Sequence, residues 1–205
     1  MTTEATAMDV DPPATTTTTA STGTVVAAAP TAAPTPADPE SLNGCWILDK
    51  SKGEWSMRGY LETMNVNELA IKAHEKGEQE YDTFHTIQLT TDRIKITKRS
   101  RVNADLVVEL RLGIEEKELL PPGDRLKASL AVSHNPRHLK IESSMHTVNG
   151  IAKVTDVKEM QPNDTGGGGV VLVQTLTVLN EQTGNSHTTT RYFIPYRGTP
   201  PHEVV

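Results

Sequence analysis

The stretch Leu42–Trp46, with the sequence LNGCW, opens a long series of strand-like segments and decides the fold of this chain. A short helical segment around Gly59–Met64, GYLETM, follows this first strand. Alternating runs of apolar and polar residues then continue to Arg191–Phe193. One strand, two short helices and a meander of hairpins predict an all-β fold, a closed antiparallel barrel. Such a barrel can enclose a ligand cavity.

Period-two alternation dominates the sequence from residue 93 onward, as expected for strands with one apolar face. Ile94 and Ile96 alternate with polar neighbours, and Leu139 and Ile141 do the same. Turn residues fall between these runs. The strongest signal is Asn149–Gly150, because a two-residue type I′ hairpin turn requires positive φ at both positions. The spacing of runs and turns favours a barrel or a sandwich of short strands.

The helical stretch decides between the barrel and the sandwich. Apolar residues at helical spacing run from Tyr60 to Ala73, and Gly59 and Asn65 stand where two helices would begin and break. We expect helices near residues 56–76 that pack on the strands. A helix pair directly after the first strand of an all-β domain is typical of a cap on an open barrel mouth.

Composition divides the chain into a tail and one domain. Residues 1–41 contain twelve Thr, six Pro, no Lys or Arg and no aromatic residue. Such a segment buries too little apolar surface to offset the entropy of ordering, so we predict a disordered acidic tail. Residues 42–197 are predicted to form the barrel, which is large enough to wrap a ligand. Residues 198–205 are predicted to form a C-terminal tail.

The net charge of −6 comes mostly from the tail. Removing the tail's five acidic residues leaves 21 acidic against 20 basic residues in the rest of the chain. A near-neutral domain gives no reason to expect nucleic acid or an anionic membrane as an obligate partner. Cys45 is the single cysteine, so an intrachain disulfide is excluded. With no secretory signal or bilayer-spanning segment in the sequence, we expect a cytoplasmic protein.

Residues 42–196 resemble the intracellular lipid-binding proteins, the family of fatty-acid-binding and cellular retinoid-binding proteins. The resemblance is carried by the order and spacing of Gly44–Leu48, Tyr60–Val66, Val107–Gly113, Val157–Met160 and Thr189–Phe193. It implies a ten-stranded up-and-down barrel capped by a helix-turn-helix. It also implies non-covalent binding of fatty acids or similar hydrophobic carboxylates, without catalysis and without a cofactor. The lid or portal residues that it implies are Met57, Tyr60, Leu61 and Met64.

The resemblance also implies a head-group site. In that family an arginine, together with an Arg-x-Tyr on the last strand, usually holds the ligand carboxylate. Arg191 matches the second arginine, whereas the first position is Lys158 and the tyrosine position is Phe193. Lysine is a point charge on a flexible stem, and phenylalanine donates no hydrogen bond. The predicted ligand-binding residues are therefore Arg191, Lys158 and Phe193, with weaker carboxylate binding or a different head group.

Two structural alternatives stay open for these cations. Arg191 shares a strand face with Phe193 and either clamps an anion inside the barrel or packs over Trp46. Lys158 is a cavity cation, the partner of Asp156, or an ordinary surface lysine. If Asp156 shares the cavity, it argues against a free fatty acid and for a polar, hydrogen-bonding ligand.

The remaining charged and titratable groups favour a surface interpretation. The sequence contains seven histidines, none in a helical metal-binding pattern, and we expect them on the surface. The basic cluster Lys98–Arg101 is expected on the solvated face of a strand, although it could also contact a membrane transiently during ligand delivery. We expect no metal site.

The best prediction is a monomeric carrier of a hydrophobic ligand, a long-chain fatty acid or similar lipid with an anionic head. Two alternatives belong to other classes. One is a scaffold barrel whose cavity is filled by its own side chains. The other is a barrel that binds haem or a small hydrophobic substrate, which needs a histidine or a carboxylate pair pointing inward near Arg191.

Overall fold

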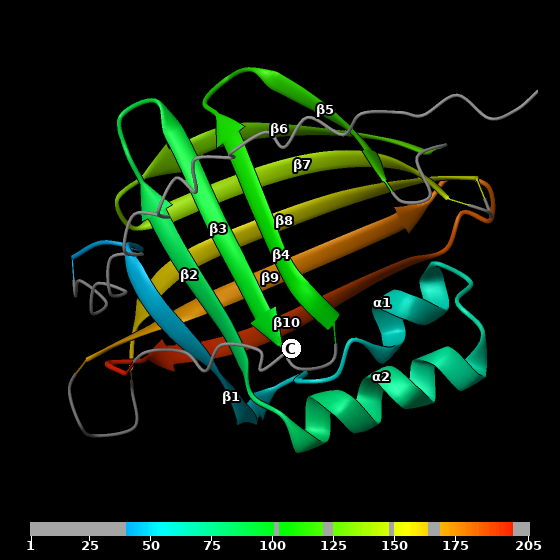
Figure 1. Cartoon of the computed structure of the whole chain (residues 1–205), viewed down its shortest axis with the longest axis horizontal. Coiled ribbons are helices and arrows are strands. Elements are labelled where there is room, and N and C mark those ends of the chain that lie inside the picture. Colours follow the sequence, from blue (N-terminus) through cyan, green and yellow to red (C-terminus); the bar gives the residue numbers. More distant parts are fainter. Residues whose placement is uncertain (1–39, 101–102, 121–124, 148–149, 164–168, 199–205) are drawn as a thin grey trace, which may run out of the picture. The chain divides into compact units, whose positions relative to one another are not determined.

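The computed structural model describes residues 40–100, 103–120, 125–147, 150–163 and 169–198. These residues form ten strands and two helices (Figure 1), in the order β1 (Gly44–Gly53), α1 (Arg58–Thr63), α2 (Glu68–Glu80), β2 (Thr83–Leu89), β3 (Arg93–Ser100), β4 (Asn103–Arg111), β5 (Glu115–Leu120), β6 (Arg125–Asn135), β7 (His138–Thr147), β8 (Gly150–Pro162), β9 (Val170–Asn180) and β10 (Ser186–Pro195). Both predicted tails lie outside the described residues, except for residues 40, 41 and 198, and so does Asn149 of the predicted turn.

The strands form one antiparallel sheet in the order β4-β3-β2-β1-β10-β9-β8-β7-β6-β5. The first strand pairs with the last, so that Trp46 lies opposite Pro195. The two ends of the sheet, β4 and β5, meet without a strand ladder, and we call this junction the seam. Beside the seam the Gly113 amide donates to the carbonyl of Ala131 at 3.2 Å. The result is a nearly closed ten-stranded barrel, which confirms the predicted fold class.

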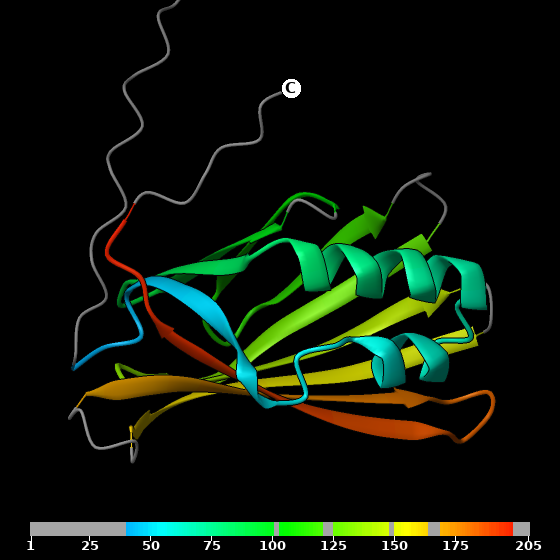
Figure 2. The same ribbon diagram turned by 90° about the horizontal axis from the view of Figure 1, so that it is seen from below.

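The two helices follow β1, as predicted, and lie side by side in both views (Figures 1 and 2). Their bounds differ from the prediction, because α2 continues to Glu80 and Gly59 lies inside α1. The last turn of α2 consists largely of good helix formers, and Lys76 lies 3.8 Å from Glu80 as an i, i+4 ion pair. No helix in the described ranges is long and apolar enough to cross a bilayer.

The break between the helices has a local cause. Asn65 adopts a positive φ of 53°, a conformation that asparagine tolerates better than most residues. Two residues later Asn67 caps α2, because its side-chain oxygen accepts a hydrogen bond from the Ala70 amide at 2.9 Å. The prediction that Asn65 breaks the helical stretch is therefore confirmed.

Two apolar clusters fill much of the interior. The first surrounds the fully buried Trp46, whose indole N–H donates to the Leu42 carbonyl at 2.9 Å. Its buried members are Leu42, Trp46, Leu48, Ile87, Ile94, Ile96, Leu110, Ala131, Leu139, Ile141, Met160, Leu172 and Phe193. The second cluster lies at the helices and consists of Ala152, Val154, Leu176 and Val178, with Met57, Tyr60, Met64 and Met145 packed against them. Along β8 and β9, the inward positions between the two clusters are polar.

Candidate functional site

A belt of inward-facing polar side chains separates the two apolar clusters. We call it the polar belt, and its members are Glu78, His85, Lys98, Asp156, Lys158, Gln174 and Arg191. The strand register sets their order: Gln174 of β9 lies opposite Lys158 of β8 on one side and opposite Arg191 of β10 on the other. On the facing strands, His85 of β2 lies opposite Lys98 of β3.

Lys158 lies within the barrel wall and is paired. Its side chain is 0% exposed, and Nζ lies 2.5 Å from Oδ2 of Asp156. Gln174 donates to the other carboxylate oxygen of Asp156 at 2.9 Å, and Lys98 Nζ lies 3.5 Å from Oδ2. Of the alternatives for Lys158, the structure shows a buried ion pair with Asp156.

The electrostatics of this pair follow from its burial. Burial alone would raise the pKa of Asp156, but the charges of Lys158 and Lys98 outweigh it and hold that pKa below its usual value. Burial lowers the pKa of Lys158 to about 8, against the opposing effect of Asp156. The pair therefore stays ionised at neutral pH, with the carboxylate shared between two lysines.

Arg191 is buried and paired with a helix residue. Its Nη2 donates to Oε1 of Glu78 in α2 at 2.9 Å, and both side chains are at most 6% exposed. The guanidinium carbon lies 5.8 Å from the centre of the Phe193 ring. The aromatic ring that contacts Arg191 is therefore that of Phe193, and not that of Trp46 as in the structural alternative. The Nε of Arg191 has no hydrogen-bond partner among the described residues. The Nε–H of Arg191 is thus both buried and, within the described part of the chain, unpaired.

Glu78 is held by three groups. Besides Arg191, its Oε2 accepts the Met57 amide at 3.0 Å and lies 3.5 Å from Nδ1 of His74. Burial tends to raise the pKa of Glu78, but the nearby His74, the charge of Arg191 and the Met57 amide together lower it. Glu78 is therefore an ionised carboxylate inside the barrel, and it connects α2 both to β10 and to the segment that leads into α1.

His85 corrects the expectation that the histidines lie on the surface. It is 2% exposed and stacks on Phe193 with ring centres 4.4 Å apart. Burial, together with the charges of Lys158, Lys98 and Arg191, lowers its pKa well below the usual value, despite the opposing effect of Asp156. His85 is neutral at physiological pH, and its Nδ1 has no hydrogen-bond partner among the described residues.

Lys98 corrects a second expectation. The basic cluster at residues 98–101 was predicted to face solvent, but the Lys98 side chain is only 30% exposed and lines the interior. Lys98 lies two positions after the buried Ile96, so it continues the inward face of β3, whereas Arg93 and Lys95 are exposed. Arg101 lies outside the described residues.

Two adjoining hollows occupy the interior beside the polar belt, with volumes of about 450 and 210 Å³. Four residues line both of them: Met57, Lys98, Leu106 and Leu176. The larger hollow also contacts Glu78, His85, Gln174 and Arg191, whereas the smaller one extends toward Ile96, Ile141, Met145 and Val154. We call the two hollows together the cavity. Its size lies within the range of small-molecule sites. More polar residues border the larger hollow than the smaller one, although Lys127 and Asp156 also border the smaller one.

The predicted lid residues lie over this cavity. Met57 and Tyr60 line it, and Met64 packs on the apolar cluster beneath the helices, whereas Leu61 is half-buried. Burial and the nearby Asp156 raise the pKa of Tyr60 to about 12. The portal role of these four residues remains a prediction.

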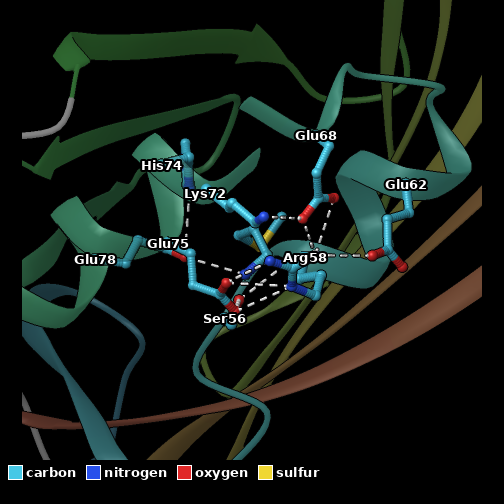
Figure 3. A network of polar contacts seen from close by, with 9 residues as sticks. Ser56, Arg58, Glu62, Glu68, Lys72, His74, Glu75 and Glu78 are labelled. Atoms are coloured by element: carbon cyan, nitrogen blue, oxygen red, sulfur yellow. Dashed lines mark hydrogen bonds and ion pairs between the residues drawn. The ribbon is translucent and has the colours of Figure 1, made fainter. Parts of the chain in front are cut away.

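An ionic network ties the two helices together (Figure 3). Arg58 of α1 donates to Glu75 of α2 at 2.7 Å, and it also contacts Glu62 and Glu68 at 3.1 and 3.3 Å. The helices are therefore coupled to each other through exposed and half-exposed charges. Within the barrel, α2 is coupled to the strands through Glu78.

Four members of the polar belt were not predicted from the sequence: Glu78, His85, Lys98 and Gln174. Alternation with buried neighbours could have located three of them, since His85, Lys98 and Gln174 each lie two positions from a buried apolar residue in a strand. Glu78 lies seven positions after the buried Ile71, on the same face of α2. In the described part of the chain, no three His, Cys, Asp or Glu residues lie close enough to hold a metal ion.

A nearly closed ten-stranded barrel, a helix pair after its first strand and a cavity under that pair define the fold of the intracellular lipid-binding proteins. The comparison with solved structures shows this likeness directly. Human cRBP IV superimposes with a TM-score of 0.52 at 18% identity, over 77% of this chain and 98% of that one. A Schistosoma mansoni fatty acid binding protein in complex with arachidonic acid gives 0.51 at 16% identity, over 75% and 95%.

A third solved structure, the REP1-NXSQ fatty acid transporter, gives a TM-score of 0.50 at 15% identity, over 79% of this chain and 98% of that one. No family model and no curated protein matches the sequence. At these identities the likeness establishes the fold, and it confirms the resemblance found in the sequence at that level.

Proposed function

We propose that this protein binds one hydrophobic ligand non-covalently and carries it within the cell. The proposed ligand is a long-chain fatty acid or a similar lipid with an anionic head. Two of the structural neighbours, the fatty acid transporter and the fatty acid binding protein with arachidonic acid, support the proposed ligand class. We further propose that the chain is a cytoplasmic monomer without catalytic activity that contacts membranes only transiently.

The observation that carries this proposal is the charge balance of the cavity. Among the described residues, Arg191 is neutralised by Glu78, whereas Lys158 and Lys98 share one carboxylate, that of Asp156. The other two cations that line the cavity have carboxylate partners of their own: Arg99 pairs with Asp105, and Lys127 pairs with Glu118. The interior therefore carries one surplus positive charge, and one anionic head group would balance it.

The direction of the ligand follows from the two ends of the cavity. Lys98 and Arg191 contact its larger, polar part, and Phe193 lies beneath Arg191. The tail would lie in the smaller part against its apolar side chains, which share this part with Asp156 and Lys127. Each buried methylene contributes about 0.8 kcal/mol. Lys158 is fully enclosed, so we assign it to holding Asp156 in place. A scaffold function is less well supported, because side chains leave this space unfilled.

The test is native mass spectrometry of freshly purified protein, followed by extraction and identification of any bound molecule. We expect a copurifying lipid near one-to-one, or uptake of added oleate by the empty protein. Lys98→Met should weaken oleate binding, whereas Lys95→Met on the exposed face of the same strand should not. A protein that is isolated empty and takes up neither oleate nor oleyl alcohol would refute the carrier function.

The same sample tests the haem alternative. His85 and His74 both line the cavity near Arg191, which is the arrangement that this alternative requires. Absorbance in the Soret region, lost in His85→Phe or His74→Phe, would favour a porphyrin over a fatty acid.

A further inference from the structure

We propose that Glu78 is an internal competitor for Arg191 and thereby determines which head groups the cavity accepts. This inference rests on the proposed function, since it concerns the head group of the proposed ligand. In this proposal Glu78, a residue of α2, selects between head groups, in addition to the residues of the barrel strands.

The geometry places a carboxylate of the protein at the position that a ligand carboxylate needs. Oε1 of Glu78 accepts from Nη2 of Arg191 at 2.9 Å, and both groups line the larger part of the cavity. A second carboxylate at the same guanidinium is opposed by like-charge repulsion in a poorly solvated space. An incoming fatty acid must therefore displace Glu78 from Arg191.

A neutral head group does not meet this obstacle. An alcohol carries no charge, so Glu78 does not repel it and can stay on Arg191. Glu78 on Arg191 therefore weakens the binding of acids relative to alcohols of the same chain length.

Displacement of Glu78 also affects the lid. The C-terminal half of α2 is attached to the barrel through the buried Glu78 and through Lys50 of β1, which donates to the carbonyls of Gln79 and Tyr81. The Glu78 carboxylate also accepts the amide of Met57, the residue that precedes α1. An acid that displaces Glu78 thus removes one of the two attachments at the end of α2 and the hydrogen bond at the start of α1, whereas an alcohol leaves both in place.

The experiment compares oleate with oleyl alcohol, by calorimetric titration of the full chain and of two variants. Glu78→Gln removes the competing charge and keeps the shape. Glu75→Gln is the matched control, because Glu75 lies one turn earlier and pairs with Arg58 outside the cavity. We expect Glu78→Gln to bind oleate at least about tenfold more tightly, with the affinity for oleyl alcohol changed by less than about threefold. Glu75→Gln should change neither affinity.

A second measurement uses the unmodified protein and does not depend on the folding of a variant. Hydrogen exchange at the Met57 amide and along the last turns of α2 should accelerate with bound oleate and stay slow with bound oleyl alcohol. If both probes bind but Glu78→Gln leaves their affinity ratio unchanged, or oleate leaves Met57 protected, the role of Glu78 is overturned and the carrier function stands. If neither probe binds to any of the proteins, the carrier function itself fails.

Discussion

Replacing Asp156 by alanine would test whether the buried ion pair controls the stability of the barrel. The substitution leaves Lys158, which is 0% exposed, without its partner at 2.5 Å, and it removes the acceptor of the Gln174 amide. Removing one member of a buried pair typically costs about 3–5 kcal/mol, because the remaining charge is left uncompensated. We expect Asp156→Ala to lower the free energy of unfolding by that amount at neutral pH.

The pH dependence of this variant gives a more specific signature. Burial already lowers the pKa of Lys158 to about 8, and without Asp156 the pKa must fall further. At pH values between the pKa of Lys158 in the folded state and its pKa in the unfolded state, the unfolded state binds more protons. The free energy of unfolding therefore rises with pH in this range. We expect Asp156→Ala to regain about 1.4 kcal/mol per pH unit above neutrality, until the pKa of an unfolded lysine is reached.

Urea unfolding, followed by the fluorescence of the buried Trp46 and the partly buried Trp55, measures both effects. The matched control is Glu181→Ala, which breaks the exposed pair with Lys153 and should cost about 1 kcal/mol or less. In the double variant Asp156→Ala, Lys158→Met, the pH dependence should disappear and much of the stability should return. A loss in Asp156→Ala no larger than in Glu181→Ala would refute the buried pair.

Three further predictions follow from the same interior. His85 is buried and neutral, so protonation favours the unfolded state: the wild type should lose stability from about pH 7 to pH 5 in urea titrations, and His85→Phe should flatten this slope. A wild-type slope in His85→Phe would contradict this explanation. Gly53→Ala should cost more than about 1 kcal/mol in thermal unfolding, because φ is +62° and a Cβ would meet the Thr190 carbonyl at 2.5 Å; Gly184→Ala, with φ +72° but open space, should cost less. Tyr60→Ala should speed oleate release roughly tenfold in stopped-flow displacement, and an unchanged rate would exclude Tyr60 from the portal.

Much of the barrel could be predicted from the sequence, because strand alternation is a local property. From this alternation Arg191 and Phe193 were expected on one face of their strand, and Asp156 and Lys158 on one face of theirs. All four side chains are buried. His85 and Lys98 obey this period as well, but their polarity favoured a surface position in the prediction. Burial of polar side chains is tolerated here because they neutralise or stack on one another, and such compensation is not visible in a single strand.

The contact between Glu78 and Arg191 could not be predicted from the sequence. Arg191 lies 113 residues away from Glu78, on another type of element. The helical period identifies the buried face of α2, but it does not identify the strand that this face contacts. The end of α2 at Glu80 was also missed, since the apolar spacing fades before the helix ends.

The pairing of the first strand with the last has a consequence for how the chain acquires its structure. Trp46 and Pro195 must meet before the barrel closes, and contacts between residues so far apart in the sequence make folding slow. During synthesis β1 therefore has no partner on its β10 side until nearly the whole domain has been made. Until then β1 and β9 each expose an unpaired edge, which can pair with another chain. The last strand thus both completes the cavity and covers these two edges.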